Sequence, residues 1–242
     1  MLLNNKTSSM NFSDEERSWR YERKGIVNSN LVKNFISQLK THPLQFEAAF
    51  ADRVVNNIYF ETYALDDFIS HIEGTMCRKK VRVRWYGSNR KADAPVVEIK
   101  LKKGNVGSKL KFSMAPFDVN ESLTKASLLS LFNKSVSPEC YAICARHAPL
   151  LINAYKRSYY VNKKNTVRVT VDQDLRSAAF SPLGWHGRLR QMRGDSCVVE
   201  IKCARESCGE LGQLDGLFMN NLTKFSKYLR GVEDVFRRNS SF

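Results

Sequence analysis

The stretch Val97-Glu98-Ile99-Lys100-Leu101-Lys102 alternates an aliphatic residue with a charged one at every step. A β-strand points successive side chains to opposite faces, so this stretch carries one apolar face and one charged face when it is extended. Four further segments place charges on alternate residues with mostly apolar residues between them: Arg20-x-Glu22-x-Lys24, Arg82-x-Arg84, Arg168-x-Thr170-x-Asp172 and Glu200-x-Lys202. The sequence therefore predicts several strands that each have a charged face.

The charged faces are rich in arginine and lysine, with a few glutamates among them. Arginine's rigid fork matches phosphate oxygens, and carboxylate oxygens hold divalent cations such as Mg²⁺. Three strands place a glutamate two residues before a lysine: Glu22/Lys24, Glu98/Lys100 and Glu200/Lys202. An ordinary amphipathic sheet would expose such charges to water. If they line a confined space instead, they must be compensated by one another, by a metal or by a ligand, which suits a polyphosphate with its divalent metal.

The composition limits the classes of partner. The 242 residues include 39 Lys+Arg against 24 Asp+Glu, a net charge of +15. This excess attracts nucleic acid, anionic membranes or phosphorylated small molecules, and composition does not choose among them. No stretch approaches the length of a membrane span, and the Asn-rich start lacks the apolar run of a signal peptide. We therefore expect a soluble, cytoplasmic protein.

Cysteine and histidine give little support for nucleophilic catalysis. The six cysteines form no Cys-x-x-Cys pair, and the four histidines stand in no arrangement with Ser or Cys that indicates a triad. Cys140, Cys144 and His147 would share one face of a helix, which is compatible either with a metal cluster or with buried reduced thiols. Buried thiols are the more common case in cytosolic chains.

Hydrophobic periodicity predicts eight strands and five helices. The first dozen or so residues are polar and are expected to be disordered, so residues 1–18 form a tail and 19–238 a single domain. The strands are expected at 19–27, 53–62, 77–87, 95–103, 107–114, 150–162, 165–173 and 195–203, and the helices at 29–39, 65–73, 119–133, 137–147 and 219–238.

The order of these elements predicts the fold class. Runs of strands separated by helices, without regular βαβ alternation, favour an antiparallel α+β architecture. A closed eight-stranded β-barrel would turn one strand face toward a lumen and leave the other to be covered by helices packed outside. This is the fold we expect.

Eight short segments, in order along the chain, resemble one known family. They are residues 20–24 (RYERK), 57–62 (NIYFET), 82–87 (RVRWYG), 97–104 (VEIKLKKG), 154–160 (AYKRSYY), 167–172 (VRVTVD), 199–202 (VEIK) and 224–229 (KFSKYL). Together they are similar to the VTC domain, the polyphosphate polymerase domain of the vacuolar transporter chaperone complex, which has prokaryotic relatives. That domain belongs to the triphosphate tunnel metalloenzymes, or CYTH superfamily. The resemblance covers about residues 19 to 232.

The resemblance implies a role for individual residues. It implies metal-dependent transfer of the γ-phosphoryl of ATP to a phosphate or polyphosphate end, with Mn²⁺ or Mg²⁺. Catalytic cations that bind the triphosphate or the growing chain would be Lys24, Arg82, Arg84, Lys100, Arg157 and Arg168. Further phosphate contacts would come from Tyr155, Ser226, Lys227 and a lysine at 111 or 109. Glu200 would hold the metal, with Glu22 and Glu98 as helpers.

The sequence also departs from the family pattern. The wider superfamily begins with Glu-x-Glu-x-Lys, whereas this chain has Arg20 at the first position. Paired glutamates hold metal in the hydrolytic branch, so Arg20 favours the polymerase branch over a two-metal triphosphatase. The chain lacks the SPX domain and the membrane segments of the eukaryotic complex, so a membrane or accessory subunit would be a separate partner.

Three other functions stay open from the sequence. An inorganic or nucleoside triphosphatase could use the same site, with water in place of the phosphate acceptor. A non-catalytic polyphosphate-binding module is the second alternative, and the joint presence of the site cations with Glu200 argues against it. A nucleic-acid binder is the third, supported only by the net charge, and it predicts steep salt dependence without a need for metal.

Overall fold

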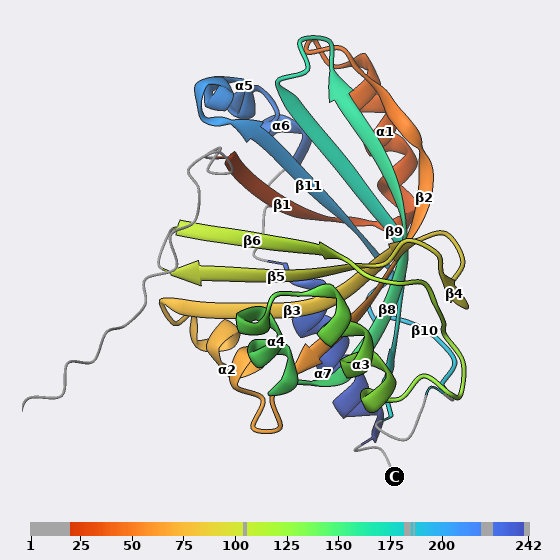
Figure 1. Cartoon of the computed structure of the whole chain (residues 1–242). Coiled ribbons are helices and arrows are strands. Elements are labelled where there is room, and N and C mark those ends of the chain that lie inside the picture. The colour runs from red at the N-terminus through yellow and green to blue at the C-terminus, as the bar shows by residue number, and fades with distance from the viewer. Residues whose placement is uncertain (1–19, 104–105, 182–184, 186, 219–224, 240–242) are drawn as a thin grey trace, which may run out of the picture.

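The computed structural model describes residues 20–103, 106–181, 185, 187–218 and 225–239, and its fold is a mixed α+β one built around a single large antiparallel sheet (Figure 1). Eight strands form the main path of the nine-stranded sheet, in the spatial order β1-β11-β9-β8-β2-β3-β5-β6, and the short β10 pairs with β9. The strands are β1 (Arg20–Asn28), β2 (Phe46–Glu61), β3 (Cys77–Tyr86), β5 (Val96–Lys103), β6 (Val106–Ser113), β8 (Ala148–Asn162), β9 (Val167–Ala179), β10 (Arg190–Gln191) and β11 (Ser196–Ala204). A separate two-stranded sheet pairs β4 (Lys91–Ala92) with β7 (Phe117–Asp118).

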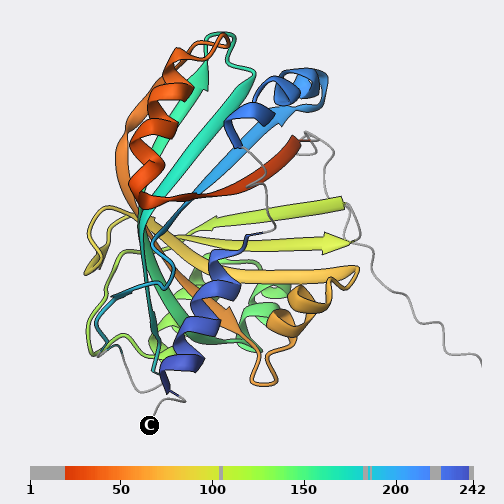
Figure 2. The same cartoon turned by 180° about the vertical axis from the view of Figure 1, so that it is seen from behind.

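The large sheet curls so that its two end strands face each other. In both views β1 and β6 run one above the other, and the long strands β2, β8 and β9 connect the two halves of the sheet on the opposite side (Figures 1 and 2). Side chains confirm this proximity, because Lys100 on β5 interacts electrostatically with Glu22 on β1 and Glu200 on β11. The charged concave side is called the inner face here, and its side chains come from every strand of the main path: Lys24, Asn57, Tyr59, Arg82, Arg84, Glu98, Lys100, Lys109, Tyr155, Arg157, Asp172, Glu200 and Lys202.

The expected closed barrel is not observed. In the described residues no strand pairing joins β1 to β6, so the sheet stays open between its ends. The inner side chains near this opening are largely lysines, among them Lys24, Lys100 and Lys109, and like charges that face one another oppose closer approach. The expected antiparallel α+β class is correct, whereas closure of the barrel is not.

The outer face of the sheet is apolar and is covered by helices. The helices α3 (Lys125–Ser135) and α4 (Pro138–Ala145) bury Leu128, Phe132 and both Cys140 and Cys144 against β2, β3 and β5. On the other half, α1 (Val32–Thr41) packs Phe35 against the valines of β9 and β11, next to the short helices α5 (Cys208–Gln213) and α6 (Asp215–Phe218). The alternation of apolar and charged residues therefore separates the two faces as expected.

The last helix, α7 (Lys227–Asn239), lies on the inner face (Figure 2). It packs Tyr228, Val232 and Val235 against Tyr59 of β2 and Leu151 of β8. The expectation that the helices pack outside is thus wrong for α7, because its apolar stripe meets apolar residues at the ends of strands whose middles are charged. Helix and strand approach closely here: a Cβ at residue 231 would lie 2.6 Å from Leu151 Cδ2, so any side chain at this position would displace the buried Leu151.

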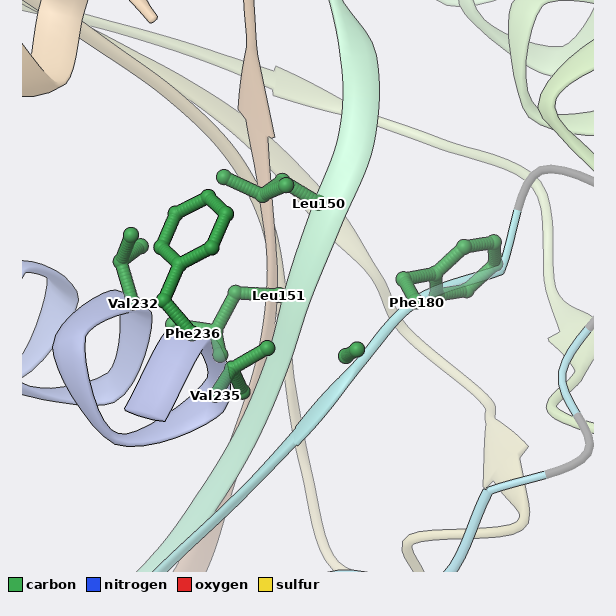
Figure 3. Close-up of a pocket in the computed structure, with 7 residues that line it drawn as sticks. Leu150, Leu151, Phe180, Val232, Val235 and Phe236 are labelled. Carbon is green, nitrogen blue, oxygen red and sulfur yellow. The ribbon is translucent and has the colours of Figure 1, made fainter. Parts of the chain in front are cut away.

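An apolar cavity of about 110 Å³ lies between the end of α7 and the sheet (Figure 3). Its walls are aliphatic and aromatic side chains alone: Leu150, Leu151, Ala179, Phe180, Val232, Val235 and Phe236. None of these groups can bind a phosphate, so the cavity is distinct from the charged inner face.

The eight expected strands correspond to the eight strands of the main path, with two differences in length. β2 begins at Phe46, before the expected residue 53, because irregularities in its pairing around Phe50 break the alternation that would reveal it. β9 continues to Ala179, beyond the expected residue 173. The strand positions are thus confirmed, and the errors lie at irregular ends.

The expected helices agree less closely with the structure. The helix expected from residue 119 begins at Lys125, because the Thr124 hydroxyl accepts a hydrogen bond from the amide of Ser127 and caps it. Asn120 makes a turn instead, where its side chain accepts from the amide of Ser122. The helix expected from residue 219 begins at Lys227, and residues 219–224 lie outside the described part of the chain. The proposed disordered tail, 1–18, also lies outside it, and α5 and α6 were not predicted.

Candidate functional site

A carboxylate on β5 neutralises two cations from neighbouring strands. Glu98 Oε2 accepts a hydrogen bond of 2.6 Å from Arg82 Nε, and Glu98 Oε1 lies 2.6 Å from Lys109 Nζ on β6. Arg82 also donates to the hydroxyl of Tyr59, at 3.2 Å. Although burial alone would raise the pKa of Glu98, the charges of Arg82 and Arg84 and the bond from Lys109 lower it to about 2. Glu98 is therefore an ionised structural partner of the inner-face cations.

We expect ionised Glu98 to stabilise the folded protein near neutral pH and to lose this effect in acid. Since its folded pKa of about 2 lies below the ordinary 4.5, the ionised carboxylate stabilises the fold above pH 4.5, and this contribution is lost as the pH falls toward 2. A shift of this size corresponds to about 3 kcal/mol of unfolding free energy. In urea unfolding, the difference between wild type and Glu98→Gln should be largest near neutral pH and shrink through this window. A difference that stays constant with pH would contradict the ionic pairing.

A second carboxylate, Asp172 on β9, is completely buried and binds two cations. Arg157 donates from Nε to Asp172 Oδ1 at 2.5 Å and from Nη2 to Oδ2 at 2.8 Å, while Lys227 Nζ lies 2.5 Å from Oδ2. Both cations also lie over the ring of Tyr155, at 5.4 and 4.9 Å from its centroid. Burial would raise the pKa of Asp172, but Lys227 and Arg157 lower it. This pairing fixes the start of α7 on the inner face.

The third group of charges lies on β1 and β11. Lys24 Nζ lies 2.7 Å from Glu22 Oε1, and Lys202 Nζ lies 2.7 Å from Glu200 Oε1. Arg157 Nη2 approaches the other oxygen of Glu200 at 3.9 Å. Burial opposes ionisation of Glu200, but Lys202 and Lys24 hold its pKa well below the usual range. Glu200 is thus a nearly buried, fully charged carboxylate.

Arg84 is held by neutral groups. It donates from Nε to Asn57 Oδ1 at 2.8 Å and from Nη2 to the hydroxyl of Tyr155 at 3.2 Å. Asn57 in turn donates to Asn153 Oδ1 at 2.8 Å. No carboxylate is bonded to Arg84 in the described residues, so no ion pair neutralises its charge there.

Two lysines on the inner face lack a carboxylate contact in the part of the chain that the structure describes. Lys80 on β3 donates to the hydroxyl of Ser226 at 3.1 Å, and its Nζ lies 5.2 Å from the ring centroid of Tyr228. Burial, with the charges of Lys24 and Lys100, lowers the pKa of Lys80 to about 7. Burial also lowers the pKa of Lys100. Such a concentration of cations favours the binding of an anion.

The two remaining expected site residues, Arg168 and Lys111, lie at the margins of the inner face. Both side chains are exposed; Arg168 pairs across strands with Lys202, and Lys111 with Glu98. Sequence reasoning left Lys111 and Lys109 as alternatives, and it is Lys109 that contacts Glu98. The structure thus brings together the central expected residues and leaves these two at the edge.

The three glutamates expected to hold metal do not converge. Glu22 and Glu200 both approach Lys202, at 4.0 and 2.7 Å, but Glu98 is bound by Arg82 and Lys109 in the other half of the sheet. Among the described residues no trio of acidic, His or Cys side chains could enclose a metal, and this includes the alternative set of Cys140, Cys144 and His147. The carboxylates separate because each is paired with its own cations.

The surroundings of Glu200 nevertheless fit a metal that is shared with a phosphate ligand. Thr170 stands directly opposite Glu200 in the pairing of β9 and β11, and its hydroxyl is buried without a hydrogen-bond partner. A carboxylate and a free hydroxyl are hard oxygen donors of the kind that Mg²⁺ and Mn²⁺ prefer. Because Mg²⁺ keeps waters and takes phosphate oxygens as ligands, one or two protein donors are sufficient.

Several residues of the site were not assigned from the sequence, chiefly Lys80, Asp172, Thr170 and Tyr59. Lys80 stands two residues before Arg82, so the alternation Lys80-x-Arg82-x-Arg84 carried a signal that could have found it. Asp172 and Thr170 were part of the quoted strand pattern, but nothing local indicated which cations they would meet. Tyr59 reads from sequence as a core aromatic.

These features define a class: an α+β protein with a curled antiparallel sheet whose inner face carries a continuous cation network. Residues 19–236 match the family model of the VTC domain, and the chain belongs to this family. The resemblance inferred from the eight segments is therefore confirmed.

Solved structures share the fold at low sequence identity. A putative adenylate cyclase from Vibrio parahaemolyticus is 12% identical, with a TM-score of 0.50, and the match covers 88% of this chain and 97% of that one. A protein from Hippeastrum, described as a putative adenylyl cyclase with a dominant triphosphatase activity, is 15% identical with a TM-score of 0.50, covering 87% of this chain and 93% of that one. No curated protein matches the chain. Within the described residues, no helix has the length and apolar character needed to cross a bilayer.

Proposed function

We propose that this protein is a metal-dependent polyphosphate polymerase that transfers the γ-phosphoryl of ATP to a phosphate or polyphosphate end. The observation that carries the proposal is the excess of uncompensated positive charge on the inner face, where Lys80, Lys100 and Arg84 lack a carboxylate contact among the described residues. Membership of the VTC domain family supports the same function. The reaction needs charge neutralisation and alignment rather than a side-chain nucleophile.

Each group of inner-face residues has a role in this proposal. Lys24, Lys100 and Arg82 neutralise the transferring phosphoryl group, and Arg84 and Arg157 hold the next phosphates along the chain. Tyr155 orients these arginines by its hydroxyl and its ring. Ser226 and Lys227 contact the phosphates from the start of α7. The exposed Arg168 and Lys111 bind the polyphosphate chain where it leaves the inner face.

Glu200, with the Thr170 hydroxyl beside it and Glu22 across the strand pair, would hold Mn²⁺ or Mg²⁺. Such an ion supplies neutralisation of the charge on the phosphate oxygens. The protein's own contribution is to keep Glu200 ionised, which the neighbouring Lys202 and Lys24 accomplish by lowering its pKa.

Hydrolysis of tripolyphosphate or of a nucleoside triphosphate is the second candidate function. Lys202 is 43% exposed beside Glu200, so water has access to the carboxylate end of the site. The triphosphatase activity described for the Hippeastrum protein, which shares the fold, makes the same alternative worth testing. Water would then take the place of the acceptor phosphate.

Products of γ-labelled ATP distinguish these functions. The purified protein is incubated with labelled ATP and Mn²⁺, and the products are separated on a gel. We expect a ladder of labelled chains that disappears when the metal is chelated. Label in orthophosphate alone would replace the polymerase with a hydrolase, and no turnover together with tripolyphosphate binding would leave a binding module. A Lys156→Met variant is the control, since Lys156 is exposed and its ion pair within the described residues is with the surface residue Asp52.

A further inference from the structure

The inner face contains two kinds of cation. Most of them contact a carboxylate: Lys24 with Glu22, Arg82 and Lys109 with Glu98, Arg157 and Lys227 with Asp172, and Lys202 with Glu200. Lys80 has no carboxylate contact among the described residues, although it sits in the middle of this network. Its neutral partners are the Ser226 hydroxyl, which it contacts at 3.1 Å, and the ring of Tyr228. The charge of Lys80 is therefore not balanced by the protein that surrounds it.

The groups facing Lys80 come from five elements, and nearly all of them are basic. Arg78 and Arg82 flank it on β3, Lys24 faces it from β1, and Lys100 from β5. His71 of α2 (Asp66–Glu73) also interacts with it, and Lys80 contributes to lowering the pKa of that histidine to about 4, after burial itself. Tyr228 of α7 presents its ring, and its hydroxyl donates to Glu61 rather than to Lys80. An anion entering this space would meet at least three cations at once.

We propose that Lys80 and Ser226 form a binding position for the phosphoryl oxygens of a polyphosphate chain, and that Lys80 takes up a proton from solvent as the chain binds. The inference deepens the proposed function and rests on its substrate class. It assigns an inner-face residue, Lys80, that the family resemblance did not supply, beside Ser226, which the resemblance did supply. In the coupled step an acid of the buffer gives its proton to the free amine of Lys80, a new N–H bond forms, and the resulting ammonium pairs with the phosphate oxygen.

The chemistry of a lysine makes this coupling possible. Burial and the neighbouring cations lower the pKa of Lys80 to about 7, so its amine is largely neutral above neutral pH. A bound phosphate chain adds negative charge at hydrogen-bonding distance and favours the ammonium again. An arginine at the same position would stay charged with or without ligand. When no anion is bound, a neutral lysine amine therefore reduces the repulsion among the neighbouring cations.

The alternative is that Lys80 serves packing alone, through its contacts with Tyr228 and Ser226. A packing role predicts that the aliphatic part of the Lys80 side chain makes its whole contribution and that the amine makes none. Methionine at this position would then behave like lysine in anion binding. The anion-binding role predicts a loss of affinity in that variant.

Calorimetry with tripolyphosphate, in the absence of metal, measures the coupling directly. Binding heats are recorded at about pH 8 in several buffers that differ in ionisation enthalpy, and the slope against that enthalpy gives the number of protons taken up. The comparison covers wild type, Lys80→Arg and Lys80→Met. Lys79→Met is the matched control, since Lys79 is the next residue along β3 and points to the opposite face. Proton exchange by the ligand itself is common to all variants and cancels in the differences.

We expect wild type to take up about 0.9 proton more than Lys80→Arg, the neutral fraction of a group with a pKa of about 7 at one unit above it. Lys80→Arg should bind tripolyphosphate at pH 8 at least as tightly as wild type, and Lys80→Met about tenfold or more weakly. Lys79→Met should match wild type in both affinity and proton uptake. Without ligand, Lys80→Met should also melt at a higher temperature than wild type, because folding no longer has to bury and deprotonate a lysine.

Equal proton uptake in wild type and Lys80→Arg would overturn the coupling, and unchanged affinity in Lys80→Met would overturn the binding position. Neither result would affect the proposed function, which is judged by the labelled-ATP products. If wild type itself failed to bind tripolyphosphate, the inference would fail, and the labelled-ATP products would still decide the proposed function.

Discussion

Replacing Glu200 by glutamine is expected to lower metal-dependent turnover of ATP by about 100-fold or more, the scale seen when one group that stabilises transition-state charge is removed. Glutamine keeps the size of the side chain and one oxygen, but it lacks the charge that Lys202 and Lys24 maintain on Glu200 by lowering its pKa. The proposed metal site would then retain Thr170 and Glu22 but lose its ionised, nearly buried carboxylate. The measurement is initial rate against Mn²⁺ concentration with labelled ATP.

Metal-free binding of tripolyphosphate separates the role of Glu200 in holding metal from a role in folding. The Glu200→Gln variant should still bind tripolyphosphate, and more tightly than wild type, because one negative charge has left the inner face. Asp93→Asn is a suitable control, since Asp93 is exposed and contacts the surface residue Lys91. Turnover at the wild-type rate in Glu200→Gln would contradict the assignment of Glu200 as a metal ligand. Loss of tripolyphosphate binding would show that the variant damages the anion site itself.

Much of the fold could be predicted because strand alternation is a local property. Val97, Ile99 and Leu101 lie on one side and Glu98 and Lys100 on the other because of strand geometry alone. Around Phe50, the irregular pairing of β2 breaks this rule, and the first part of the strand was missed. The inner position of α7 could not be predicted either, because its apolar stripe is equally compatible with either face of the sheet. Closure of the barrel depends on the meeting of β1 and β6, which no local pattern describes.

The candidate site shows the same division between local and long-range information. The strand alternation indicated several of the cations, and the family resemblance supplied the site assignments, that of Arg157 among them. Most of these residues do meet on the inner face. Their carboxylate partners were not predicted, since Arg157 pairs with Asp172 on the neighbouring strand β9 and Lys227 reaches the same carboxylate from a helix far along the chain. The three glutamates share one local pattern, two residues before a lysine, yet Glu98 contacts two cations and Glu200 lies beside an unpartnered threonine hydroxyl. Four statements stay predictions: the functional roles of these residues, a single domain over 19–238, a cytoplasmic location and an accessory partner.

The second large effect is expected from Asp172→Asn, which should lower the free energy of unfolding by about 3–5 kcal/mol, the cost of leaving buried charges without their partner. Asp172 is fully buried and neutralises Arg157 and Lys227 together, so its loss leaves two cations facing each other at the start of α7. Urea unfolding of wild type and variant measures the difference. Asp52→Asn removes an exposed carboxylate paired with Lys156 and should cost less than about 1 kcal/mol.

Tripolyphosphate should reverse much of the loss in Asp172→Asn, because a bound phosphate can occupy the place of the missing carboxylate between Arg157 and Lys227. A ligand that binds the folded state more tightly stabilises it more at a given concentration, so the gap to wild type should narrow as tripolyphosphate is added. Sulfate at equal ionic strength controls for screening of the exposed charges. A gap that stays unchanged would mean that Arg157 and Lys227 do not bind phosphate, and that their pairing with Asp172 only anchors the helix. A smaller difference in unfolding free energy between wild type and Asp172→Asn would instead show that the two cations form an anion site. In the wild type without phosphate, the Asp172 carboxylate is the anion in that site.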